Sequence, residues 1–488
     1  MKTSDNNTIF FRQATTLFLV GMTVSSLLFA GDKTSPRLVG MGRTFTALSR
    51  GLDAVGTNPA NLALNDRDAT VTLDIISTGL SVGSDFINYK IYNDFFTGDP
   101  NLPLVENKDG KLVRQSKFLS EQDKKDVLAL FPEGIARTQA SIGADAVGVS
   151  FQVGDFGFAI APSVKVAMNL DLPEGLLKFP LNGNVDEDFT APINYSFNET
   201  AVNVSAVGEV NFSAGYLLPV ELPDVSELAV GVGIKYLQGF FYTGTDHYNA
   251  SIDVDGNTYI ETSTGQTHFK AERFRTEFDF LQYVAIDTTD NKPVGSGMGF
   301  DIGASALLMN VVRVGISVTD IGSITWDKYT KAIVGKSSFV LSGYGNKEQR
   351  DSLSKGFRGE TKDTTSFSYS LPTALHIGSE MRVDEVLTSL PFRWTVAVDM
   401  HVGFNNVAGN TTLAQFAIGT ELDPLAGWLP LRTGIFLGGR ERFAWSAGFG
   451  LHLANTFDLD FATQSIALLT NPNSFRIGSF VMGMRLRF

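Results

Sequence analysis

Apolar and polar residues alternate with a period of two along many stretches of this chain. In the run from Phe156 to Leu170, the alternate positions Phe158, Ile160, Val164, Val166, Met168 and Leu170 are apolar, and small or polar residues lie between them. The same period recurs in Val202 to Phe212, Val230 to Tyr236, Val312 to Val318, Trp394 to Val402, Leu431 to Leu437 and Phe443 to Leu453. Because successive side chains of a strand point to opposite faces, each run predicts a β-strand with one apolar face.

The length of these runs separates two kinds of β-protein. Strands of soluble sandwiches usually have about five or six residues, whereas a tilted strand that crosses a membrane needs about ten. Several runs here keep the alternation for that longer distance, so we predict an all-β protein, a transmembrane antiparallel barrel of about 14 strands. The sequence offers about fifteen candidate strands, but single-chain bacterial barrels have an even number of strands. The count must therefore be wrong by at least one strand, and we expect this error between Phe240 and Leu281. A soluble periplasmic sandwich is the alternative.

The last strand has a pattern of its own. Phe480, Met482, Met484, Leu486 and the terminal Phe488 share one parity, and Gly483, Arg485 and Arg487 share the other. An aromatic residue at the end of such a strand resembles the signal read by the barrel-assembly machinery of the outer membrane, which this resemblance implies as a partner. The alternative is a plain amphipathic closing strand.

The connections between the predicted strands differ in length at the two ends of the barrel. Counting back from Phe488, the two longest, 320–368 and 464–475, fall on one side, and the two shortest, 309–310 and 454–455, fall on the other. Long outer loops and short periplasmic turns are the rule for outer-membrane barrels. We therefore expect the protein in the bacterial outer membrane, with lipid around its apolar face.

The N-terminus is typical of a secreted protein. Lys2 and Arg12 precede an apolar run from Ala14 to Ala30 that is interrupted by Thr, Ser and Gly. This run is short of the ~20 strongly apolar residues of a membrane helix, so residues 1–30 are predicted to be a signal peptide.

The stretch from Leu38 to Leu64 fits neither a signal nor an alternating strand. Small residues crowd its first half, which allows backbone to pack against backbone. Asn58, Pro59 and Ala60 then predict a short helix, because Asn caps free N–H groups and Pro suits the first helical position. We interpret residues 31–68 as a small N-terminal plug.

This stretch resembles the N-terminal hatch of the FadL-like outer-membrane barrels. The resemblance rests on the small residues, the Asp-Ala pair that follows them, and then Asn58, Pro59 and Ala60. This superfamily includes long-chain fatty-acid transporters and the PorV secretion proteins, and a Bacteroidetes-type group of uncharacterised outer-membrane proteins matches best. The resemblance implies a barrel that passes small hydrophobic molecules beyond its plug. The alternative is a PorV-like secretion-system or surface-attachment component that acts by binding proteins.

Residues 69–488 are predicted to form the barrel, with a loop and helix inserted at 94–137. Within this insertion, Ser120 and Asp123 precede Val127 and Leu128, a pattern that predicts a capped amphipathic helix docked on the barrel or plug. The resembled group has a similar helix, which aligns with Ser120 to Ile135.

Composition agrees with this picture and excludes some classes of function. The 48 Gly and 38 Phe with only 19% charged residues suit strands with one lipid-facing surface. The net charge of −13 argues against a nucleic-acid partner, and the absence of Cys excludes disulfides and thiol catalysis. The five histidines lie far apart in the sequence, so we expect no metal site, no cofactor and no enzymatic activity.

Some charged residues share alternate strand positions with the glycines, opposite the apolar series, and should therefore face the lumen. They either form ion pairs with one another or line a charge-selective pore. They are Lys165, Glu209, Lys235, Asp301, Arg313, Glu380, Arg382, Asp399, Arg432, Asp458, Asp460, Arg485 and Arg487.

Pro162 lies within one long predicted strand and cannot donate a backbone hydrogen bond to the neighbouring strand, because proline has no N–H. We expect the strand to bend there and the wall to be weakest, which would allow a lateral exit for an apolar ligand as in the resembled transporters. The alternative is a strand that ends near Ala161 or tolerates a bulge.

Overall fold

The computed structural model describes residues 35–488, except 100, 108–109, 116, 183–193, 221, 264, 342–346, 426, 454–455, 468–470, 472 and 474–475. The predicted signal peptide, residues 1–30, lies outside the described residues. Among the helices of the described chain, none is both long and apolar enough to cross a membrane.

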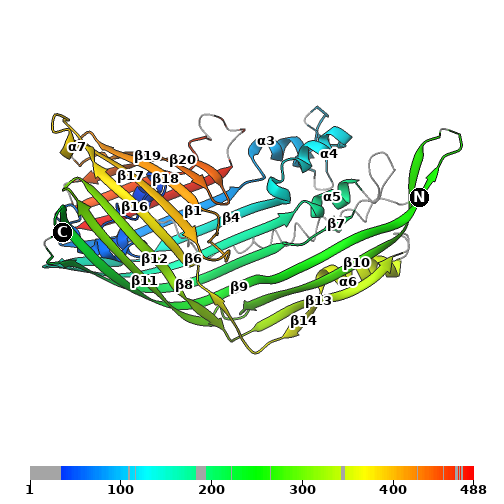
Figure 1. Ribbon diagram of the computed structural model, residues 1–488, viewed down its shortest axis with the longest axis horizontal. Coiled ribbons are helices and arrows are strands. Elements are labelled where there is room, and N and C mark those ends of the chain that lie inside the picture. The colour runs from blue at the N-terminus through cyan, green and yellow to red at the C-terminus, as the bar shows by residue number, and fades with distance from the viewer. Residues whose placement is uncertain are drawn as a thin grey trace.

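In the described part of the chain, fourteen strands close into an antiparallel barrel, as predicted (Figure 1). They are β1 (Val71–Ser84), β4 (Ile135–Asp145) continued by β5 (Gly148–Val153), β6 (Phe156–Pro173), β8 (Ala201–Leu218), β9 (Val225–Ile260), β11 (Gly295–Leu308), β12 (Val312–Trp326), β16 (Ala374–Arg382), β17 (Arg393–Gly403), β18 (Gln415–Asp423), β19 (Leu431–Gly438), β20 (Arg442–Leu453), β21 (Phe457–Thr463) and β22 (Ile477–Arg487). β22 pairs with β1, with Arg487 opposite Thr72, and this pairing closes the ring.

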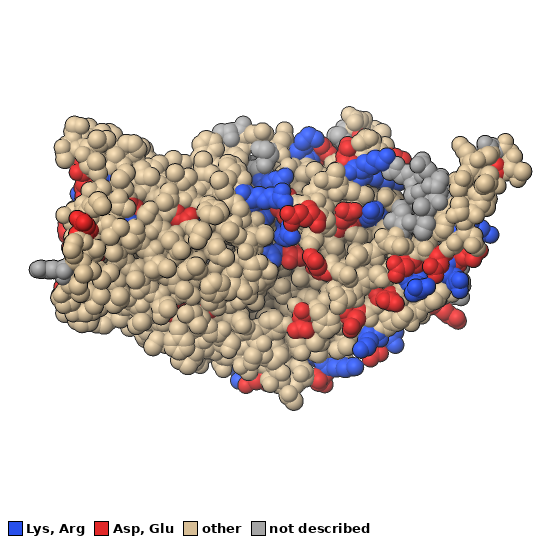
Figure 2. All heavy atoms as spheres, viewed as in Figure 1, with Lys and Arg blue, Asp and Glu red and all other residues tan. Residues whose placement is uncertain are grey.

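The outer surface of the barrel is apolar. Large apolar side chains such as Phe300, Ile418 and Phe480 point outward and are about half exposed. Figure 2 shows few charged side chains on the barrel half, whereas they gather over the other half. A closed ring with an apolar exterior leaves no strand edge open to lipid, as a spanning barrel requires. The protein is therefore a barrel of the outer membrane.

The two ends of the barrel differ as predicted. The connections 154–155 and 309–311 are short and lie at the end where the chain terminates, while the connections 85–134 and 404–414 are longer and lie at the other end (Figure 1). By the barrel rule, the end with short turns faces the periplasm.

An outer extension rises beyond the barrel and explains the surplus strand. The first part of β9 pairs with β11 in the ring, but from Phe241 onward β9 pairs with β10 (Thr267–Ile286). β10 then pairs with β13 (Thr330–Leu341), and β13 with β14 (Glu360–Asp363). The region from Phe240 to Leu281, where we expected the counting error, is the place where these strands leave the ring.

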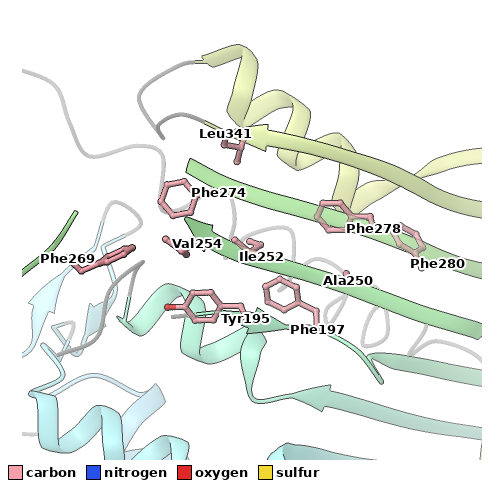
Figure 3. Close-up of a cluster of buried hydrophobic side chains, with 10 residues drawn as sticks. All are labelled: Tyr195, Phe197, Ala250, Ile252, Val254, Phe269, Phe274, Phe278, Phe280 and Leu341. Atoms are coloured by element: carbon pink, nitrogen blue, oxygen red, sulfur yellow. The ribbon is translucent and has the colours of Figure 1, made fainter. Parts of the chain in front are cut away.

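The outer extension has an apolar core of its own. Figure 3 shows this cluster, which consists of Tyr195, Phe197, Ala250, Ile252, Val254, Phe269, Phe274, Phe278, Phe280 and Leu341. Side chains of α5 (Gly175–Asn182) and α6 (Lys347–Arg358) pack against it. The other short elements are α3 (Tyr89–Ile91), η3 (Tyr92–Phe96), β2 (Val105–Glu106), β3 (Leu112–Val113), η4 (Pro132–Gly134), β7 (Tyr195–Ser196), β15 (Phe367–Ser370) and α7 (Val383–Val386).

The predicted inserted helix is α4 (Glu121–Leu128). Ser120 and Asp123 form a reciprocal capping box, and the hydrogen bonds from Ser120 lower the pKa of Asp123 to about 2. Val127 packs with Phe86 and Ala136, so the helix docks on the outer end of β4.

Candidate functional site: the lumen and its wall

The N-terminal residues 35–68, here called the luminal segment, lie inside the barrel near its periplasmic end (Figure 1, blue). α2 (Pro36–Gly40) contacts β19 to β22, whereas η2 (Pro59–Ala63) contacts β6, β8, β9 and β11. η1 (Gly51–Ala54) lies between them in the chain and contacts β1, β5 and β6. The segment therefore crosses the lumen from one wall to another.

The predicted short helix begins at Pro59 and is the 3₁₀-helix η2. Asn58 Oδ1 accepts a hydrogen bond from Ala60 N at 3.3 Å, and its Nδ2 donates to the Thr46 carbonyl at 2.9 Å and the Ala304 carbonyl on β11 at 3.2 Å. Asn58 thus joins the two halves of the segment to the wall.

Glycines on the luminal face of the strands allow this close approach. A Cβ at Gly215 would lie 2.7 Å from the Pro59 carbonyl oxygen, and a Cβ at Gly315 would lie 2.6 Å from the Thr46 carbonyl oxygen. The strand glycines whose added Cβ would come closer than 3.4 Å to the segment are Gly148, Gly157, Gly215, Gly231, Gly303, Gly315, Gly378, Gly419, Gly434, Gly448 and Gly483. The strand face that carries the glycines is therefore the surface on which the segment packs.

The predicted luminal charges face the interior, with one exception. Arg382 is the last residue of β16, and it lies exposed at the barrel end, where it pairs with Asp384 and Glu385. Other predicted members pair with one another, such as Lys165 with Glu209 at 3.1 Å.

Several luminal charges pair with the luminal segment instead, which the sequence did not indicate. Arg485 Nη2 donates to Asp53 Oδ1 at 2.7 Å, Arg487 pairs with Asp66, and Glu380 pairs with Arg50. Burial tends to raise the pKa of Asp53, but the Arg485 guanidinium outweighs burial and holds that pKa below its ordinary value. These pairs fix the segment as well as the wall.

A cavity of about 180 Å³ lies between the luminal segment and the connection 404–414. The segment contributes apolar side chains, among them Leu38, Phe45, Leu52 and Val55. The walls contribute mainly polar and charged side chains, which include Gln139, Asp145, Ser163, Lys165, Glu209, Asp320, His376 and His401. The segment also contributes Arg43 and Asp53, so its side of the cavity carries both apolar and charged side chains, whereas the barrel side is mainly polar.

The connection 404–414 folds inward and covers the outer side of this cavity. Asn169 Nδ2 on β6 donates to the Val407 and Asn410 carbonyls at 2.7 and 2.8 Å, and Gln139 Nε2 on β4 donates to the Gly409 carbonyl at 3.2 Å. The connection leaves β17 and returns to β18, so it crosses the lumen to reach β4 and β6.

Two histidines that are far apart in the sequence meet beside the cavity. His376 on β16 and His401 on β17 are register partners, and their Nδ1 atoms lie 2.7 Å apart. His401 Nε2 lies 3.1 Å from the Arg43 carbonyl oxygen, and that oxygen accepts only, so the Nε2 atom donates. The Phe45 ring packs against both imidazoles, with centroids 5.2 and 4.4 Å away. The pair therefore links two strands to the luminal segment.

The barrel wall is irregular beside Pro162, although β6 itself runs unbroken through it. The interruption lies in the neighbouring strand, between β4 and β5. Asp145 is opposite Ser163 and Val149 is opposite Ile160, so the β4–β5 side has one extra residue, which makes a bulge. Ala146 N donates to the Pro162 carbonyl at 3.0 Å, and Pro162 has no N–H to return a bond.

The cavity reaches the wall at this bulge. Its lining includes Asp145, Ala146 and Gly148 on one side of the irregular pair, and Ala161 and Ser163 on the other. The residues that flank Pro162 therefore face the cavity.

One cluster in the described part of the chain has the geometry of a metal centre, with ligand atoms of His452, Asp458 and Asp460 within 4.8 Å of one another. Guanidinium groups already contact each member: Arg487 contacts Asp458, Arg432 contacts Asp460, and Arg67 contacts His452. These cations give the cluster a structural explanation without a metal ion.

Comparisons with known proteins give one family and a set of similar barrels. The model of the family of unknown function DUF5723 matches residues 59–455. No curated protein matches this chain in sequence.

Solved structures of similar fold cover nearly the whole chain. The Pseudomonas putida toluene transporter TodX is 10% identical, with 94% of this chain and 98% of that chain covered and a TM-score of 0.41. A Pseudomonas aeruginosa FadL homologue is 10% identical, with 94% and 99% covered and a TM-score of 0.43. The CymD monoaromatic hydrocarbon channel is 11% identical, with 95% and 98% covered and a TM-score of 0.43. Each of these three chains is similar to this chain in fold, and a place in the Bacteroidetes-type group stays a prediction.

Proposed function

Since the chain belongs to the family of unknown function DUF5723, we propose a function from its own geometry: the barrel passes small, largely hydrophobic molecules through the outer membrane, and the luminal segment acts as its plug. The observation that carries this proposal is the cavity between the luminal segment and the inward connection 404–414. A concave cavity inside a barrel, in which apolar side chains and convergent polar groups meet, is the kind of place where small molecules bind.

The plug role rests on how the luminal segment is held. It crosses the lumen, packs on glycines and pairs with charges of several strands, so in its place it blocks free diffusion. Protein lacking residues 38–64 is expected to conduct more ions across liposome membranes than the intact protein. Equal conductance of the two, with both barrels folded, would contradict the plug.

The exit route in this proposal is lateral, beside Pro162. The cavity extends to the bulge between β4 and β5, opposite Pro162 on β6, where the ladder lacks the hydrogen bond that Pro162 does not donate. A molecule leaving there enters the apolar belt directly and need not displace the ion pairs of the luminal segment. A local change in this wall requires fewer broken contacts than release of the segment.

The outer extension supports a second candidate function, a PorV-like role in secretion or surface attachment by protein binding. It has an independent apolar core and a charged surface beyond the membrane belt (Figures 2 and 3). A pull-down in mild detergent separates the two functions. Stoichiometric recovery of a secretion-system or cargo protein would favour the second, and co-purified lipid or hydrophobic ligand would favour passage.

A further inference from the structure

We infer that the cavity selects a small amphipathic molecule of single-ring size whose polar end is neutral or cationic, and that it rejects carboxylates. This inference rests on the proposed passage function and narrows its substrate class. It uses three properties of the cavity: its size, the charge of its lining, and a hydroxyl group without a partner.

The volume of the cavity matches a ligand of about one ring. Its volume is about 180 Å³. For comparison, an engineered cavity of about 150 Å³ holds a benzene molecule. A long acyl chain does not fit this volume in a single compact conformation. The apolar side, with Phe45, Leu38 and Val55, suits the ring of such a molecule.

The lining carries more acidic than basic side chains. Three basic residues line the cavity (Arg43, Lys165 and Arg485), against five acidic residues (Asp53, Asp74, Asp145, Glu209 and Asp320).

Ion pairs behind this lining also contain both signs. Lys235 contacts Asp320 and Asp301, and Glu441 contacts Arg43. Because acidic side chains outnumber basic ones in the lining itself, an anion that enters the cavity is repelled more than it is attracted, and a cation is favoured.

A polar anchor lies where the cavity meets the bulge. The Ser163 side chain is only 8% exposed and lines the cavity, and its Oγ has no hydrogen-bond partner among the described residues. A buried hydroxyl without a partner costs free energy that a ligand group recovers by hydrogen bonding to it. Asp145 lies directly opposite Ser163 in the ladder. A ligand hydroxyl or ammonium group at this point meets both side chains, while a carboxylate meets Asp145 with like charge.

Three ring compounds that differ only in their polar end test this inference. Full-length protein in a non-ionic detergent is dialysed to equilibrium at pH 7.5 against benzylamine, benzyl alcohol or benzoate. We expect benzylamine and benzyl alcohol to bind at least about tenfold more tightly than benzoate. Ser163→Ala should weaken benzyl alcohol binding, and Asp145→Asn should weaken benzylamine binding more than benzyl alcohol binding. The matched control is Asp279→Asn, at an exposed residue of the outer extension.

The outcomes separate this inference from the proposed function. Benzoate binding as tight as benzylamine binding would overturn the selectivity, while benzyl alcohol binding would still support a small-molecule cavity. Binding that is unchanged in both cavity variants would overturn the assigned position of the ligand. If none of the three compounds binds, the substrate class is wrong, and the conductance of the protein lacking residues 38–64 still tests the plug independently.

Discussion

The Asp399 carboxylate on β17 accepts two hydrogen bonds from Thr46 of the luminal segment, one from the backbone N–H and one from Oγ1, both at 2.8 Å. The Phe45 backbone N–H donates to the same Oδ2 atom at 2.7 Å. The three donors belong to two adjacent residues, so one barrel side chain holds a turn of the segment. Asp399 is 5% exposed, and burial keeps water from competing for these bonds.

Asp399→Asn is therefore expected to loosen the luminal segment. The amide accepts through one oxygen only and can place its NH2 group against the three donors, and a buried donor left without a partner costs about 1–3 kcal/mol. We expect single-channel conductance in planar bilayers to show an open fraction raised about tenfold or more. Asp279→Asn, which makes the same chemical change in the outer extension, should leave conductance as it is. A folded Asp399→Asn barrel that conducts like the intact protein would disprove this attachment.

Glycine-to-alanine changes in one strand test the packing of the luminal segment. At Gly215 on β8 an added Cβ collides with the backbone of Pro59 and Ala60, whereas at Gly208 on the same strand it meets mainly the movable Phe240 ring, at 3.2 Å. Overpacking costs roughly 1–3 kcal/mol, so Gly215→Ala should raise ion conductance at least about fivefold. Gly208→Ala is the control, and equal conductance of the two variants would argue against backbone contact at Gly215.

Much of the barrel was predictable because lipid imposes a simple rule on every strand. One face must be apolar, so a period of two marks β6, β8, β12 and β20 without knowledge of their neighbours. The same rule explains the miscount. β9 continues to alternate beyond Gly239, since the outer extension also has a buried face, and a period of two does not tell which strand lies next to it.

The luminal contacts were less predictable because they depend on residues that meet across the barrel. His376 and His401 come together only through the register of β16 with β17. The connection 404–414 is rich in Asn and Thr, the composition of an exposed turn, although it folds inward onto Asn169. The sequence showed that glycines recur on one face of the strands, but it did not show which residue of the luminal segment packs against each glycine.

Pro162→Ala tests the lateral exit. Alanine restores the N–H that the ladder lacks beside the bulge, so the wall should become more regular and uptake of a hydrophobic probe into liposomes should slow. Folding should be intact by heat-modifiable gel mobility. Pro173→Ala, at the end of the same strand, is the matched control. Uptake that is unchanged in folded Pro162→Ala protein would remove the lateral exit from the proposed function.

Low pH should weaken the attachment of the luminal segment to the barrel by protonating Asp53. Arg485 keeps the pKa of Asp53 below its ordinary value of 3.8. The ion pair therefore stabilises the seated segment at pH values above 3.8 and is lost as pH falls through the lower pKa of the seated state. We expect conductance to rise only as pH falls below 3.8, and Asp53→Asn should already conduct more at pH 7 and rise less on acidification. A variant with the same acid response as the intact protein would exclude Asp53 as the titrating group.

The seam between β1 and β22 has a consequence for the order of assembly. It pairs the first strand with the last, and the Phe488 N–H donates to the Val71 carbonyl at 2.8 Å. The ring therefore stays open until β22 has paired with β1. Because the luminal segment contacts strands from both halves of the sequence, it is enclosed in the same step. Truncation of β22 should thus leave two unpaired strand edges and an unenclosed segment, a species prone to edge-to-edge aggregation.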